Sequence, residues 1–278
     1  KRQTYTFTNG GTAGSSAMTT LPNYTPAPFY PTYITMPQNG YQYLTIGNTG
    51  VYEITAYGSM GGTGGSGVAG SGGTMRGSIS LSVNDVLILC VGQQGLYPGG
   101  INGGGGGGMS AIFLLSGGTG TPIPLLVAAG GGGVAGPGTG SPPTNYNGFG
   151  PSSSWDTEAT ASALQGNDRS AGSATQVSVA TVYANATFSY GLINSSGTRL
   201  SGVGSTNLAA NAGGWGGAGC GGGGAGNGGG GGGWRGSLIT PAKTGGTAGT
   251  NFARTTLTSV SYVGNNAATG KITINRIS

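Results

Sequence analysis

Only 5% of the 278 residues are charged, and ten Lys and Arg against five Asp and Glu give a net charge of +5 with no histidine. The basic residues are scattered, which excludes the clustered positive surface that nucleic-acid binding requires, and no apolar run approaches the roughly 20 residues that span a bilayer. A hydrophobic fraction of 35% can form a core, so we expect a folded domain and not a disordered chain.

The apolar residues of the first half fall in short blocks that predict strands. These strands cover 4–8, 41–46, 50–57, 79–83 and 86–90. The link Asn84-Asp85 between the last two predicts a hairpin, because Asn and Asp tolerate the positive φ of tight turns.

The second half continues the strand pattern. A second hairpin is predicted between 109–115 and 122–129, and further strands cover 176–183, 187–190, 257–263 and 271–277. The best helical candidate, 155–164, is short, and no longer stretch has apolar residues at i, i+3, i+4 and i+7. The chain is therefore predicted to be all-β.

Glycine accounts for 66 residues, and glycine-rich tracts interrupt the strands at 58–73, 103–108, 130–140 and 213–236. In the first tract, glycine recurs at every third position: Gly58, Gly61, Gly64, Gly67, Gly70 and Gly73. A polyproline-II-like helix has three residues per turn and no internal hydrogen bonds, so this register lets another backbone approach closely. We expect a packed bundle of glycine helices; a solvated linker is the alternative.

No residue pattern indicates catalysis or a cofactor. There is no histidine to act as a base, and Asp156 and Glu158 lie in a loop-like stretch that predicts a solvated surface. No cluster of residues suggests a metal site, so we expect no enzyme activity, metal or cofactor. Cys90 ends an apolar strand and is expected to be a small buried residue; one disulfide with Cys220 is the alternative.

Several pieces of the chain, in order, resemble the glycine-rich extracellular region of the anaplastic lymphoma kinase and leukocyte tyrosine kinase receptors. They are Tyr5–Thr8, Gly50–Gly58 with the glycine register, Leu87–Gly95, Gly103–Phe113, Pro124–Gly133, Gly213–Gly236 and Gly270–Ile274. The resemblance implies a tumour-necrosis-factor-like, jelly-roll β-sandwich that carries an inserted bundle of polyglycine-II helices. The kinase and the epidermal-growth-factor-like segment of those receptors have no counterpart in these 278 residues.

The resemblance implies one composite domain over 1–278. Its sandwich strands would lie mainly in 1–129 and 250–278, and the Pro-, Ser-, Asn- and Ala-rich residues 141–212 would form variable loops. The receptors bind basic cytokines through acidic surface residues. This chain has only Glu53, Asp85, Asp156, Glu158 and Asp168, so we carry over the fold and not the receptor role.

We expect an extracellular, secreted structural protein whose leader has been removed and which assembles with copies of itself into a fibre or surface layer. Low charge leaves little barrier to packing, and the strand with Tyr5 and Phe7 could add to the sheet of a neighbour. One alternative is a receptor-binding adhesin that contacts surface glycans or proteins through 141–212; its candidate aromatic contacts are Tyr146, Phe149, Trp155, Trp215 and Trp234. Another alternative is a soluble ligand-binding ectodomain.

Overall fold

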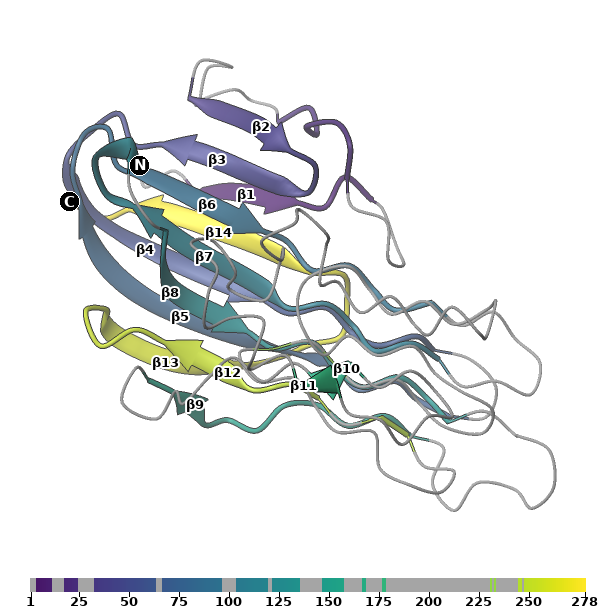
Figure 1. Cartoon of the computed structure of the whole chain (residues 1–278). Coiled ribbons are helices and arrows are strands. Elements are labelled where there is room, and N and C mark those ends of the chain that lie inside the picture. The colour runs from purple at the N-terminus through teal and green to yellow at the C-terminus, as the bar shows by residue number, and fades with distance from the viewer. Residues whose placement is uncertain are drawn as a thin grey trace, which may run out of the picture.

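A computed structural model describes residues 4–11, 18–24, 33–63, 67–96, 104–119, 122–135, 147–157, 167–168, 177–178, 231, 233, 245–246 and 248–278. Within these residues the chain is almost entirely β-structure (Figure 1). The described part contains a single short helix, a 3-10 turn at Ser116–Gly118. The prediction of an all-β chain is confirmed.

The strands form two main sheets. The five-stranded sheet has the order β1 (Thr4–Thr8), β14 (Lys271–Arg276), β4 (Gly50–Tyr57), β5 (Gly72–Leu81) and β13 (Thr258–Asn266). The seven-stranded sheet has the order β2 (Ile34–Gln38), β3 (Tyr41–Thr45), β6 (Val86–Cys90), β7 (Ser110–Leu115), β8 (Ile123–Ala128), β12 (Asn251–Ala253) and β9 (Trp155–Asp156). A separate pair consists of β10 (Asn167–Asp168) and β11 (Val177–Ser178).

The two main sheets pack face to face and enclose one hydrophobic core. Ile54 and Ile274 of the five-stranded sheet and Leu87, Leu89 and Ile112 of the seven-stranded sheet are fully buried in the same cluster. Alternate residues of each strand point to opposite faces, so one apolar residue in two is enough to build this core. The arrangement is a sandwich of two sheets.

The predicted hairpin at Asn84-Asp85 is wrong, because β5 and β6 belong to different sheets. Asn84 does adopt a positive φ of 70°. Its N–H, however, donates to the Ile46 carbonyl (2.9 Å), while the Asp85 carboxylate accepts the N–H of Ser82 and of Gly117 (2.8 Å each). These bonds hold the turn as a crossing from one sheet to the other, which buries the apolar faces of both strands.

The predicted hairpin of 109–115 with 122–129 is confirmed as the antiparallel pair of β7 and β8. At the start of 155–164, the best helical candidate of the sequence, Trp155 and Asp156 form β9, which pairs parallel with β12, in agreement with the all-β prediction. Residues 158–166 and the predicted strand at 187–190 lie outside the described residues. Part of the range expected to form loops therefore completes a sheet.

At one end of the sandwich the chain leaves the strands as extended, glycine-rich segments that run side by side (Figure 1). We call the described part of these segments the glycine array. It comprises 58–63, 67–71, 91–96, 104–109, 129–135, 147–150, 245–246, 248–249 and 268–270. It follows directly from the ends of β4, β6 and β8, so the sandwich sets the position and direction of these segments.

Hydrogen bonds between the segments of the array repeat every three residues. Gly58 and Gly61 both donate to the segment 70–73, at 2.8 and 3.0 Å. The same spacing occurs for Ser59 and Gly62 (to 105–108), Gly104 and Gly107 (to 131–134), Gly105 and Gly108 (to 93–96), Gly131 and Val134 (to 59–62), and Gly246 and Gly249 (to 130–133). Successive N–H groups thus point to different neighbours, unlike the two-residue alternation of a sheet.

At its glycine contacts the array has no room for a Cβ atom. A Cβ on Gly58 would lie 1.9 Å from the Ala129 carbonyl oxygen, and one on Gly61 would lie 2.2 Å from that of Gly132. Neither glycine has a positive φ. Glycine is therefore needed here for its missing side chain and not for its backbone freedom.

Gly61→Ala is expected to lower the free energy of unfolding by about 1–3 kcal/mol, because the new methyl group must push two backbones apart. Chemical unfolding measures the loss, and hydrogen exchange at Gly104–Gly108 should rise. Gly47→Ala is the matched control, since its Cβ would meet only the Tyr33 ring at an ordinary 3.5 Å. Equal stability of the two variants would contradict a packed array.

Candidate functional site

Three glycines of the predicted three-residue register, Gly58, Gly61 and Gly70, lie where segments of the array touch. Besides Gly58 and Gly61, a Cβ on Gly70 would lie 2.1 Å from the Phe149 carbonyl oxygen. Gly73 instead lies in β5, where an added Cβ would lie 2.8 Å from Asn251 Oδ1, while Gly67 is half-exposed. Gly64 lies outside the described residues.

The contact glycines Gly92 and Gly95 lie outside every tract predicted from the sequence, and so do Gly148, Gly245 and Gly270. A Cβ on Gly92 would lie 2.3 Å from the Gly108 carbonyl oxygen, and one on Gly95 would lie 2.1 Å from that of Gly105. They follow β6 with the same three-residue spacing with which Gly58 and Gly61 follow β4. That spacing after a strand, rather than glycine density, is the signal that could have found them.

Four polar side chains bond to the array where it leaves the sandwich, and we call this set the collar: Asn9, Ser110, Asn251 and Asn266. Ser110 Oγ accepts the Gly92 N–H (3.0 Å) and donates to the Tyr57 carbonyl (2.6 Å). Asn9 Nδ2 donates to the Gly92 carbonyl (3.1 Å), and Asn266 Nδ2 donates to that of Gly58 (2.8 Å).

Asn251 is the most buried amide of the collar, with no exposed surface. Its Oδ1 accepts the Ala129 N–H (2.9 Å), and its Nδ2 donates to the carbonyls of Ser152 and Ser154 (3.0 and 3.2 Å). One side chain thus satisfies peptide groups of two segments that no strand partner reaches at this point. Buried peptide groups need such partners, so the collar lets paired strands change into the array without loss of hydrogen bonds.

The predicted assembly strand is built into the sandwich as β1. Phe7 is 1% exposed and packs edge-to-face on Tyr24, with ring centroids 5.5 Å apart, whereas Tyr5 is half-buried. Burial raises the pKa of the Tyr24 hydroxyl, and this hydroxyl accepts the Thr8 N–H (3.3 Å). Since β1 already pairs with β14, only its outer edge is available to a partner.

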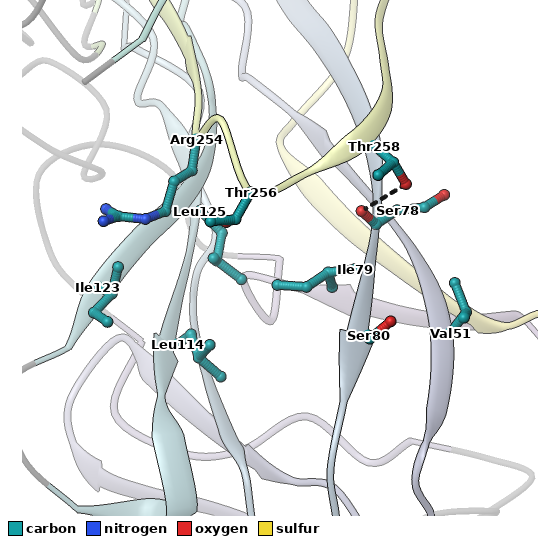
Figure 2. Close-up of a pocket in the computed structure, with 10 residues that line it drawn as sticks. All are labelled: Val51, Ser78, Ile79, Ser80, Leu114, Ile123, Leu125, Arg254, Thr256 and Thr258. Carbon is teal, nitrogen blue, oxygen red and sulfur yellow. Dashed lines mark hydrogen bonds between the residues drawn. The ribbon is translucent and has the colours of Figure 1, made fainter. Parts of the chain in front are cut away.

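A groove opens between the two sheets at the side of the sandwich (Figure 2). The link between β12 and β13 crosses from one sheet to the other. On the far side of this crossing, the end of β5 no longer pairs with β13 and the start of β8 no longer pairs with β12. The cavity measures about 490 Å³ and is lined by Val51, Ser78, Ile79, Ser80, Leu114, Ile123, Leu125, Arg254, Thr256 and Thr258. Arg254 is the single ionisable residue in this lining.

Asp156 and Cys90 are both buried in the fold. The solvated position expected for Asp156 is wrong, because its side chain is 8% exposed and accepts the Thr250 hydroxyl at 3.3 Å. Cys90 is fully buried, as expected. Cys220 and Glu158 lie outside the described residues, and so does the predicted disulfide.

Two of the five aromatic residues considered for sugar contacts are described, and both are exposed. Phe149 is 45% exposed and Trp155 is 38% exposed. Both lie in the segment 147–157, which leads from the array to β9. Tyr146, Trp215 and Trp234 lie outside the described residues.

Within the described ranges, no three His, Cys, Asp or Glu side chains gather as a metal site would require. In that same part of the chain, no helix is both long and apolar enough to cross a bilayer. The chain matches no protein-family model, and a search of curated proteins finds no match. The likeness to the glycine-rich receptor region remains a prediction.

Asn251→Ala is expected to destabilise the protein by about 1–3 kcal/mol, because it leaves the buried Ala129 N–H without its acceptor. Thermal or chemical unfolding measures the change. Asn48→Ala is the control, because this asparagine is exposed and a substitution there should stay within about 0.5 kcal/mol. A collar that merely covers the surface would give the same small effect for both variants.

Proposed function

We propose that the chain is a non-enzymatic, extracellular structural protein, a self-assembling subunit of a fibre or surface layer. In this proposal the array is a bundle of polyglycine-II helices, carried by a jelly-roll, tumour-necrosis-factor-like sandwich. The observation that carries it is the three-residue repeat of hydrogen bonds between backbones in direct contact. Three residues per turn, bonded laterally and not internally, is the geometry of that helix.

Mechanical stiffness is the property that such an array would supply. Each segment bonds to several neighbours at once, and no side chain separates the backbones, so bending one segment must break bonds to the others. A linker of the same composition would be a flexible coil. An array of this kind needs few charged residues and few large side chains, which agrees with the composition of the chain.

Two observations favour a structural role over catalysis or cytokine binding. In the described part of the chain, Asp85 and Asp156 are both at most 8% exposed and Glu53 is half-buried, which leaves little acidic surface there for a basic ligand. The groove has an apolar wall and one ionisable residue, Arg254, so it offers no acid–base pair. The extracellular location rests on the resemblance to the receptor ectodomains.

Electron microscopy of purified protein over a range of concentrations tests the assembly. We expect fibres or two-dimensional layers, because low charge leaves little repulsion between copies. Sedimentation at the same concentrations should show species larger than the monomer. A strictly monomeric protein at high concentration would contradict the proposal.

An adhesin module is the second candidate, favoured by the exposed rings of Phe149 and Trp155 on one segment. Aromatic faces stack on sugars, so a glycan array should give hits that Phe149→Ala and Trp155→Ala each reduce at least about tenfold, equivalent to roughly 1.4 kcal/mol. Val68→Ala, which removes another exposed apolar side chain of the array, is the control. No hits, together with unchanged attachment to cells, would eliminate this candidate.

A further inference from the structure

The two main sheets end in four outer strands, and three of them carry features that block further pairing. β13 has two register shifts, with Gly264 at φ 141° beside the second. β2 contains Pro37 and a register shift, and β9 has only two residues. Bulges, proline and short length are the usual means by which proteins protect sheet edges.

β1 has none of these features. It pairs with β14 in an unbroken register from Thr4 opposite Asn275 to Thr8 opposite Lys271. Its five residues include no proline, glycine or charged side chain. Among the described outer strands of the two main sheets, β1 is therefore the one that lacks these protecting features.

Contacts at Thr8 show which backbone groups of β1 face outward. The Thr8 N–H donates to the Tyr24 hydroxyl (3.3 Å), and Gln42 Nε2 donates to the Thr8 carbonyl (2.8 Å). Backbone groups alternate in direction along an antiparallel strand, so those of Thr4 and Thr6 point the same way, away from β14. Both threonines are exposed, and they form the open part of the edge.

We propose that β1 pairs antiparallel with β1 of a second copy of this chain, about a two-fold axis at Tyr5, and joins two five-stranded sheets into one. Thr4 of each copy lies opposite Thr6 of the other, and each such pair exchanges both backbone hydrogen bonds. A register centred on Thr6 would place Thr4 opposite Thr8, whose outward groups are occupied. This pairing rests on the proposed self-assembly and identifies β1 as the strand through which two copies make contact.

A second copy fits this edge because the edge is self-complementary. The two-fold axis brings no charged residue of β1 opposite another, since 4–8 is uncharged in a chain of net charge +5. Across the ladder, β14 has two basic residues: Lys271 lies opposite Thr8, and Arg276 follows Asn275, the partner of Thr4, so neither lies opposite the paired stretch 4–6. A closed two-fold contact of this kind is the commonest way for copies of one chain to associate.

Thr6→Pro tests the pairing. The Thr6 N–H points away from β14, so proline removes the intermolecular donor and keeps the ladder within the sheet, as proline does on edge strands. We expect the dissociation constant between copies to rise about 10–100-fold in analytical ultracentrifugation, the effect of losing two backbone bonds. Thr6→Val, which keeps the N–H, is the matched control and should associate like the wild type.

Cross-linking tests the register. In a Cys220→Ser background, Tyr5→Cys is expected to form an intermolecular disulfide, because Tyr5 faces its counterpart in a close, non-hydrogen-bonded pair. Thr6→Cys alone should not, since each Thr6 faces Thr4. Preferential cross-linking of Thr6→Cys would overturn the register.

The outcomes separate this inference from the proposed function. Assemblies in electron micrographs that persist unchanged in Thr6→Pro would overturn the β1 pairing and leave self-assembly standing. A wild-type protein that remains monomeric at every concentration would overturn both. Loss of association in Thr6→Pro with unchanged thermal unfolding would support the pairing.

Discussion

Direct contact between glycine backbones is the constraint on which the rest of this structure depends. The N–H and C=O groups of the array find partners in neighbouring segments, and carbonyl oxygens occupy the positions that Cβ atoms would take at Gly58, Gly61 and Gly131. Ordering glycine loses much backbone entropy. The hydrogen bonds and the fixed strand ends of the sandwich offset that loss, so the array depends on the sandwich for its order.

The collar connects the two kinds of backbone pairing. A sheet bonds each strand to neighbours on two sides with a two-residue repeat, whereas the array bonds in several directions with a three-residue repeat. Where the pairing of the sheet ends and the pairing of the array begins, some peptide groups have no backbone partner. Ser110 and Asn251 bond to those groups, which explains the presence of buried polar side chains next to an apolar core.

In the proposed self-assembly, low charge and the protection of sheet edges act together. With few charges, copies would repel each other weakly, so the exposed strand edges would decide which strands pair. Bulges in β13 and Pro37 in β2 block pairing there, and the uncharged edge of β1 is left open. The apolar groove at Ile79 and Leu125 is a second opening, formed because the link between β12 and β13 crosses between the sheets.

The sequence by itself determined the all-β class, the strands at 50–57 and 86–90 and the β7–β8 hairpin, because the alternation of apolar residues is a local property. It also determined the contact glycines Gly58, Gly61 and Gly70, because their three-residue spacing is local too. Only the tertiary structure decided that β5 and β6 lie in different sheets, that Asp156 is buried, and that Asn251 bonds to two other segments of the chain. These outcomes depend on partners far away in sequence, such as Ile46 for Asn84 and Ala129 for Asn251, and local pattern carries no information about such partners.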